Sequence, residues 1–202
     1  MAPKPPTVIP VATKDLAASL GDFDALVLVA PAPVASHAAA LGAPIVAALE
    51  AAAAADATFA RAAKAPFCLP VREAPGGRLV VATLTELTDD LDDARSLAEG
   101  AFAAVQRAVE AGAKRPLVVA AWPDLPRYAR ALDVVTLAAL ATRWVPLEAR
   151  EARKGHRFAE QIGVAGLDVG RANDLARIEA GRFLCRDITG TEPERMAPKR
   201  VA

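Results

Sequence analysis

Three short apolar runs, which show no alternation of apolar and polar residues, most constrain the fold of this chain. They cover residues 25–30 (ALVLVA), 79–84 (LVVATL) and 117–122 (LVVAAW), and Asp, Gly or Pro residues bound them. Strands buried on both faces of a largely parallel sheet have such sequences, whereas strands with one solvated face alternate. We therefore predict that these runs form the centre of a buried, largely parallel sheet.

Weaker strand candidates lie at residues 8–12, 67–71 and 143–147, and each contains a proline. Because proline has no N–H to donate to a strand ladder, these segments are predicted at sheet edges. The sequence Pro75-Gly76-Gly77 lies between the second candidate and the run at 79–84. It indicates a hairpin turn, since glycine adopts a positive φ without steric cost.

Helical patterns separate the predicted strands. Residues 89–110 carry an apolar stripe at helical spacing, with Thr88 as the expected N-cap, and residues 44–64 and 125–141 are the other two predicted helices. Strands that alternate with helices indicate an α/β fold with helices on both faces of the sheet. Alanine accounts for 50 of the 202 residues, so we expect these helices to pack closely.

The composition changes after residue 147. Residues 148–164 are predicted to be a charged linker, and residues 165–189 a helix with apolar side chains on two sides. One predicted stripe holds Leu167, Leu175, Ile178 and Cys185, and the other holds Val169, Ala172, Ala176, Ala180 and Phe183. A sheet covers only one side of a helix, so the other side is expected to meet a second domain or subunit. The predicted division is an α/β domain over residues 1–147, the linker, and an interdomain helix with the start of a further domain over residues 165–202.

Composition and motifs exclude several classes of partner. Lys and Arg total 24 and Asp and Glu total 24, so the chain lacks the basic excess expected of a protein that binds nucleic acid or an anionic membrane surface. No apolar run reaches the length of a membrane span, and the first residues lack the pattern of a secretory signal. Cys68 and Cys185 are expected to be buried and unpaired, which predicts a reducing, cytoplasmic location.

The residues by themselves indicate no catalytic, cofactor-binding or metal site. His37 and His156 lie outside any metal-binding spacing, and the acidic run at residues 89–93 is explained by the positive end of a helix dipole. No serine lies in a nucleophile motif, and there is no glycine-rich phosphate loop.

The carboxyl-terminal segment is more informative. Residues 172–177 read ANDLAR, and from Gly181 the chain continues GRFLCRDITGTEPERMAPKRVA. This segment resembles the interdomain junction of the leucyl aminopeptidase family, the M17 metallo-exopeptidases. That family typically has a helix ending in Arg-Asp-Leu, then Asn-x-Pro-Pro-Asn, a few residues and Thr-Pro.

The match to the family pattern is partial. The Arg-Asp-Leu positions hold Arg186, Asp187 and Ile188, the second proline is Pro193, and Ala197-Pro198 takes the place of Thr-Pro. The chain departs from the pattern at Gly190, Glu192 and Glu194, where the family has Asn, Pro and Asn. Upstream of this segment, only the order of elements agrees.

The resemblance implies a fold and a role. In the family, a macrodomain-like α/β N-terminal domain contributes to hexamer assembly, and a C-terminal domain binds two divalent metals, zinc, manganese or magnesium, through Lys, Asp and Glu. The family signature Asn-Thr-Asp-Ala-Glu-Gly-Arg is absent from this sequence, which ends at Ala202 where the catalytic domain is expected to begin. The implied protein is the non-catalytic N-terminal assembly domain of a metallo-exopeptidase that removes N-terminal residues from peptides.

Two other interpretations stay open. The chain is alternatively a stand-alone or catalytically degenerate homologue that acts as a structural or protein-binding module. A ligand-binding macrodomain is disfavoured, because the glycine-rich phosphate loop is missing. In the main interpretation, the helix meets the parent's own catalytic domain or other subunits of a homo-hexamer, through residues expected to include Leu175, Ile178, Phe183, Arg186 and Asp187.

Overall fold

The computed structural model describes residues 4–61, 65–87, 92–153 and 155–191. The strands are β1 (Thr7–Val11), β2 (Ala25–Pro31), β3 (Phe67–Pro70), β4 (Arg78–Leu84), β5 (Pro116–Ala120) and β6 (Gln161–Ala165). The α-helices are α1 (Leu16–Ser19), α2 (Ala43–Ala55), α3 (Ala94–Glu110), α4 (Ala131–Ala141), α5 (Leu147–Ala152) and α6 (Val169–Gly190). The predicted α/β class and the long C-terminal helix are confirmed.

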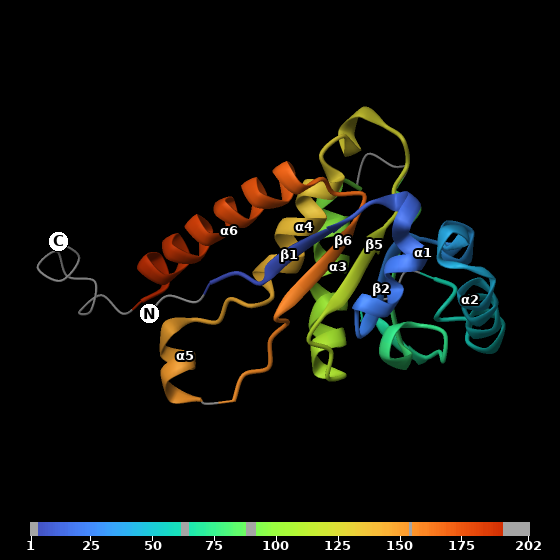
Figure 1. Cartoon of the computed structure of the whole chain (residues 1–202), viewed down its shortest axis with the longest axis horizontal. Coiled ribbons are helices and arrows are strands. Elements are labelled where there is room, and N and C mark those ends of the chain that lie inside the picture. The colour runs from blue at the N-terminus through green and yellow to red at the C-terminus, as the bar shows by residue number, and fades with distance from the viewer. Residues whose placement is uncertain (1–3, 62–64, 88–91, 154, 192–202) are drawn as a thin grey trace, which may run out of the picture.

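The strands form one six-stranded sheet in the order β1-β6-β5-β2-β4-β3 (Figure 1). All neighbouring pairs are parallel except β3 and β4, which are antiparallel and joined through a turn at Pro75–Gly77. Gly76 and Gly77 have φ values of 56° and 69° in this turn, as the hairpin prediction requires. The edge strands β1 and β3 contain Pro10 and Pro70, so the edge prediction is correct for both.

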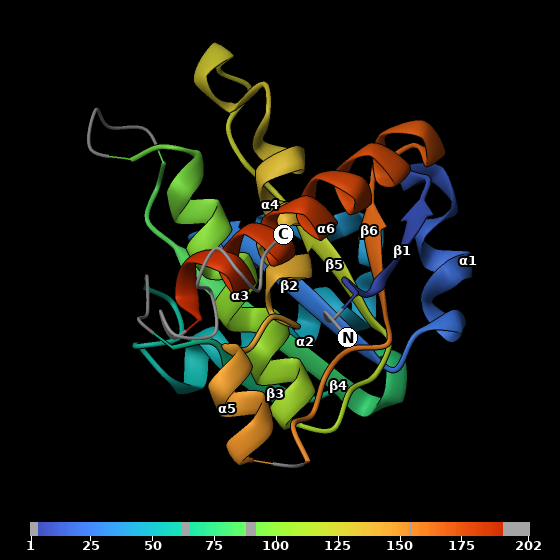
Figure 2. The same ribbon diagram turned by 90° about the vertical axis from the view of Figure 1, so that its left-hand side faces the viewer.

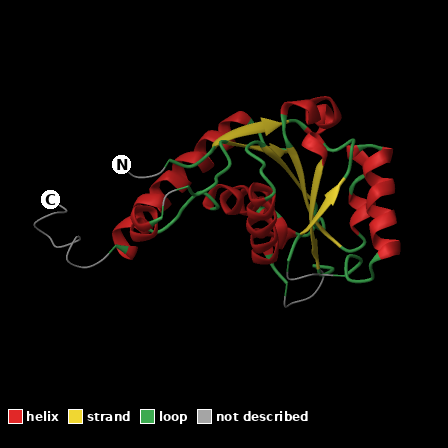
Figure 3. Ribbon diagram, turned by 90° about the horizontal axis from the view of Figure 1, so that it is seen from below, coloured by secondary structure: helices red, strands yellow, loops and turns green. Residues whose placement is uncertain are grey.

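The sheet has a separate apolar core on each face, and helices cover both (Figure 3). All seven residues of β2 are buried. Its alternate residues Ala25, Val27 and Val29 point to the side of α3 and α4, whereas Leu26, Leu28 and Ala30 point to the side of α2. This double burial explains why the central strands read as unbroken apolar runs.

The predicted linker at residues 148–164 is wrong at its carboxyl end, because Gln161–Ala165 form β6 between β1 and β5. A glycine in the middle of β6 hides this strand from a search for apolar runs. Structurally it is required: a Cβ at Gly163 would overlap the ring of Phe23 and lie 2.9 Å from Leu117 Cδ1. The predicted strand at 143–147 does not form, since residues 142–146 are turn and loop and α5 starts at Leu147.

Two helices differ in length from the prediction, and in both an aspartate at the helix end redirects the backbone. Helix α3 begins at Ala94, where the Asp93 carboxylate accepts a hydrogen bond from the Arg95 N–H at 2.7 Å; the predicted cap, Thr88, lies outside the described residues. Helix α2 ends at Ala55, because the next residue, Asp56, turns the chain by accepting from the Thr58 N–H at 2.8 Å.

The other two predicted helices start later than expected. A 3-10 turn at Pro126–Tyr128 precedes α4, which begins at Ala131. Helix α6 begins at Val169 instead of residue 165, after Gly166 at φ +82° and the N-cap Asp168.

Helix α6 packs on α4 and β1 at one edge of the sheet. Its C-terminal half runs on past the sheet, and α5 lies on an arm below it (Figures 1 and 2). None of the helices in the described part of the chain is long and apolar enough to cross a membrane.

Candidate functional site

The side chains that could serve as catalytic groups or metal ligands lie apart. No group of three or more His, Cys, Asp or Glu residues within 4–61, 65–87, 92–153 and 155–191 is arranged to hold a metal ion. His37 is exposed, and His156 lies beside the Phe158 ring with its centroid 5.9 Å away. Asp93 is used as the α3 cap and Asp92 accepts from Thr85 at 3.0 Å, while Asp89 and Asp90 lie outside the described residues.

Three hollows in the described part of the surface were compared for groups that could act together. A hollow of about 350 Å³ next to the end of β4 is lined by hydroxyl and carboxylate side chains, among them Thr85, Asp92 and Glu99. Two adjoining hollows of about 610 and 620 Å³ separate α3 from residues 142–160, and there Arg143 stacks on Phe158. None of these hollows has a glycine-rich wall of backbone N–H groups for a phosphate.

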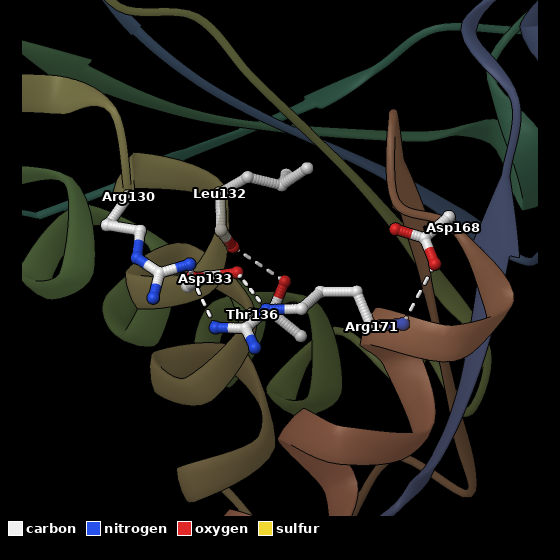
Figure 4. Close-up of polar contacts among 6 residues, drawn as sticks. All are labelled: Arg130, Leu132, Asp133, Thr136, Asp168 and Arg171. Carbon is white, nitrogen blue, oxygen red and sulfur yellow. Dashed lines mark hydrogen bonds and ion pairs between the residues drawn. The ribbon is translucent and has the colours of Figure 1, made fainter.

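Polar contacts fix helix α6 at both ends. At the N-terminal end, Asp168 caps the helix by accepting from the Arg171 N–H at 2.9 Å (Figure 4). The Arg171 guanidinium donates two hydrogen bonds to Asp133 of α4, at 2.8 and 2.6 Å, and Arg130 lies 3.3 Å from the same carboxylate. A paired, planar contact of this kind fixes orientation as well as distance.

The Asp133–Arg171 pair changes the acidity of the aspartate. The hydrogen bonds from Arg171 lower the pKa of Asp133 below its ordinary value of 3.8, and the nearby positive charges act in the same direction. Partial burial opposes this shift, but the hydrogen bonds outweigh it.

At the far end of α6, Asp187 joins the helix to the arm that carries α5. Its carboxylate accepts from Trp144 Nε1 at 2.9 Å and from Arg150 Nη2 at 2.8 Å. Only 11% of the Asp187 side chain and 17% of the Arg150 side chain are exposed. This pair therefore tethers the C-terminal half of α6 to a segment some forty residues earlier in the sequence.

A second buried carboxylate lies about two turns closer to the helix start. Glu179 is fully buried, and Arg186 Nη1 and Arg182 Nη1 lie 2.6 and 3.0 Å from its two oxygens. The Arg186 guanidinium also lies over the Trp144 and Phe183 rings, 5.8 Å from each centroid. Charged and aromatic side chains thus fill the space where α6 has passed the sheet.

The five residues predicted to form an interface divide between two faces of α6. Leu175, Phe183 and Asp187 are buried against this chain's own elements, and Arg186 is partly buried beside Trp144. The remaining residue, Ile178, lies on the opposite face, with 46% of its surface exposed. The exposed face also holds Leu184, Ile188 and Cys185.

Helix α6 therefore does carry apolar residues on two sides, as predicted, but the prediction assigned several of these residues to the wrong side. Leu175 and Phe183, predicted on opposite sides, share the buried face. The expected burial of both cysteines is also wrong, since Cys185 is exposed and Cys68 only partly buried. Sequence reasoning missed Trp144, Arg150 and Asp133, whose roles depend on contacts with distant residues that leave no local signal.

The comparisons with known proteins first define the class of the fold. A macrodomain mutant from Oceanobacillus iheyensis superimposes with a TM-score of 0.53 and 10% identity, covering 92% of this chain and 98% of its own. A tomato leucine aminopeptidase mutant superimposes better, with a TM-score of 0.68 and 15% identity over 98% of this chain and 41% of that chain. The chain is therefore a macrodomain-like α/β unit followed by a long helix, as predicted.

A relative found by sequence adds information beyond the fold. A Caenorhabditis elegans protein named "Putative aminopeptidase W07G4.4" is 34% identical over 137 residues, which are 63% of this chain and 25% of the relative. No family model matches the chain. The predicted resemblance to the leucyl aminopeptidase family is confirmed, and the chain spans about a quarter of the length of this curated relative.

Proposed function

We propose that this chain is the non-catalytic N-terminal assembly domain of a leucyl-aminopeptidase-like metallo-exopeptidase, which removes N-terminal residues from peptides. The observation that carries the proposal is the superposition on the tomato leucine aminopeptidase, which uses 98% of this chain but only 41% of that one. The relative from Caenorhabditis elegans supports the same assignment, since 75% of its length lies outside the matched region.

In this proposal, hydrolysis belongs to the part of the parent protein that the chain does not include. The two divalent metals expected there, zinc, manganese or magnesium, would polarise the scissile carbonyl and activate a water molecule. The described residues of this chain do not fit such a pair of metals, because they bring together no three side chains that could ligate one. No step of the reaction is therefore assigned to them.

The contribution of this chain is structural. The Asp133–Arg171 pair fixes the start of helix α6 to the α/β body, and the Trp144–Arg150–Asp187 contacts fix its far end to the arm that carries α5, so both ends of the helix are held. A helix held in this way can transmit a fixed orientation to the catalytic domain or to other subunits of a homo-hexamer. The two unpaired cysteines fit a cytoplasmic location, where thiols stay reduced.

The alternative, a stand-alone or catalytically degenerate module, is supported by the exposed apolar face of α6, since such faces attract partners. The intact mass of the endogenous protein separates the two functions. A mass well above the 20.9 kDa of this chain supports the assembly domain, and a mass of 20.9 kDa supports the module.

The assay of the isolated chain is hydrolysis of a leucyl anilide with added manganese or zinc, together with metal analysis of the purified protein. We expect neither metal-dependent turnover nor stoichiometric metal. The matched control is the longer parent chain, which should show both. Metal-dependent turnover by pure 1–202 would refute the assignment of a non-catalytic role.

A further inference from the structure

A hollow on the face of the sheet opposite to α6 has no part in the function proposed above. It has a volume of about 560 Å³ and lies between α2, the segment at residues 33–39 and the segment at residues 59–60. Leu49 of α2 belongs to the apolar core on this face, whereas Leu175 of α6 belongs to the core on the other. Figure 1 shows α2 and α6 at opposite ends of the molecule. We call this feature, lined by residues of these three segments, the α2 hollow.

The lining of the α2 hollow is largely apolar. Val34, Leu49 and Phe59 are buried, and all three belong to the core on this face of the sheet. Four of the other lining residues are alanines, whose side chains end at Cβ and leave the space above them open. Small-molecule sites typically have volumes of about 300–1,000 Å³, mostly apolar walls and a few polar groups. The α2 hollow has the size and the walls of such a site.

One charged side chain, Glu50, lies among the described residues that line the hollow. It is on the same side of α2 as Val46, Leu49 and Ala53, because positions three or four residues apart on a helix are neighbours. The Glu50 side chain is exposed, and no described residue forms an ion pair or a hydrogen bond with its carboxylate. Its negative charge is therefore available to a ligand.

The other polar side chain of the lining also offers an acceptor. The Ser36 hydroxyl donates to the Pro33 carbonyl at 2.7 Å, so its oxygen stays able to accept a hydrogen bond. The nearby Asp56 carboxylate is occupied, since the Thr58 N–H and hydroxyl donate to it at 2.8 and 2.6 Å. Arg61 lies outside the lining. The side chains of the hollow thus favour a ligand that donates hydrogen bonds and carries a positive charge.

From this combination we propose that the α2 hollow binds a small organic ammonium ion, an amine attached to a branched aliphatic or aromatic group. The apolar group packs on Leu49 and Phe59, and the protonated amine donates to the Glu50 carboxylate and the Ser36 oxygen. A neutral molecule leaves the carboxylate unpaired, and an anion is repelled by it. Free amines and peptide N-termini share this chemistry, since an α-amino group with a pKa near about 8 is mostly protonated at neutral pH.

The first experiment is an amide NMR titration of labelled 1–202 at neutral pH with 3-methylbutylamine. We expect saturable shifts at residues 33–39, 46–53 and 59–60. The neutral isostere 3-methylbutan-1-ol should bind about threefold more weakly, because it lacks the ion pair, and the anion 3-methylbutanoate more weakly still. Ethylamine should bind at least about tenfold more weakly, because it buries three fewer carbon atoms.

A second set of probes separates the two sources of the amine. Leucinamide has the charge, the side chain and the amide of a peptide that begins with leucine. If it binds as well as 3-methylbutylamine or better, the ligand is a peptide N-terminus. If only 3-methylbutylamine binds, the ligand is a free amine.

The third experiment changes the hollow itself. Glu50→Gln should weaken binding of 3-methylbutylamine about threefold and leave binding of 3-methylbutan-1-ol unchanged. Glu73→Gln is the matched control, because Glu73 is also exposed but lies outside the lining. Ala53→Leu fills part of the volume and should weaken every probe, and circular dichroism should show all three variants folded.

Three results overturn the proposal. The first is the absence of saturable shifts with any probe, and the second is a set of shifts centred on residues outside the α2 hollow. The third is equal affinity for the amine and the alcohol, or a Glu50→Gln variant that binds the amine like the unmodified chain. The readout is binding and not hydrolysis or assembly, so this proposal and the proposed function can fail separately.

Discussion

The contacts of Asp187 with the arm predict that two alanine variants on helix α6 differ strongly in their free energy of unfolding: Asp187→Ala should be much less stable than Asp174→Ala. Replacing Asp187 with alanine removes the acceptor for both Trp144 Nε1 and Arg150 Nη2. Arg150 then keeps a largely buried positive charge, 17% exposed, with no counterion at this position. Breaking a buried ion pair from one side costs about 3–5 kcal/mol, and the residual exposure of Arg150 places the expected loss near the lower bound.

The control is Asp174→Ala on the same helix. Asp174 lies 3.7 Å from Arg177, and 57% and 82% of the two side chains are exposed. Exposed pairs of this kind contribute about 0.5 kcal/mol or less. Asp187→Asn should fall between the two alanine variants, since the amide oxygen still accepts from Trp144 but has lost the charge that pairs with Arg150.

The assay is equilibrium urea unfolding followed by circular dichroism, with hydrogen exchange at residues 180–190 to detect fraying of the helix end alone. A double variant, Arg150→Leu with Asp187→Leu, should recover part of the loss, because it removes both charges together. If Asp187→Ala matches Asp174→Ala in urea and leaves hydrogen exchange unchanged, the tether contributes nothing and the reasoning fails.

Further predictions concern Asp133, which pairs with the N-terminal end of α6, and two glycines, Gly163 and Gly181. Because Arg171 lowers the folded-state pKa of Asp133, the stabilisation is complete above the ordinary value of 3.8 and is lost as the pH falls through the lowered pKa. Asp133→Asn should therefore cost most at neutral pH and progressively less in strong acid, in parallel urea titrations; a cost independent of pH would contradict this. Gly163→Ala should destabilise by about 1–3 kcal/mol, since its Cβ overlaps the Phe23 ring. Gly181→Ala places a methyl group in open space inside a helix, so it should stabilise the monomer by about 0.5–1 kcal/mol. If thermal unfolding shows that both glycine variants change the stability in the same direction, the packing argument is refuted.

The central sheet could be predicted because burial on both faces removes polar residues from a strand. Strands β2, β4 and β5 carry this signal in full. Strand β6 does not, since Gln161 begins it and Gly163 interrupts it. The glycine is there because the Phe23 ring occupies the place of its side chain, which is a contact across about 140 residues. A pattern confined to neighbouring residues cannot reveal such a requirement.

The faces of α6 were harder to predict for a related reason. Periodicity shows that apolar residues lie on two sides, but only the contacts with α4, β1 and Trp144 decide which side is covered. Glu179 looks like a solvent-facing residue in the sequence, yet it is fully buried because Arg182 and Arg186 neutralise it from three and seven residues away. Asp187 gives no local sign of its partners on the arm.

The pairing of β1 with β6 has a consequence for synthesis and truncation. Among the described strands, β1 pairs only with β6. The first strand to be synthesised therefore cannot pair until residues 161–165 are made, about 150 residues later. Long-range closure of this kind slows folding and leaves an unpaired strand exposed while the nascent chain grows. A truncation before Gln161 therefore removes β6 and α6 together, and it leaves β1 without a neighbouring strand in the described sheet.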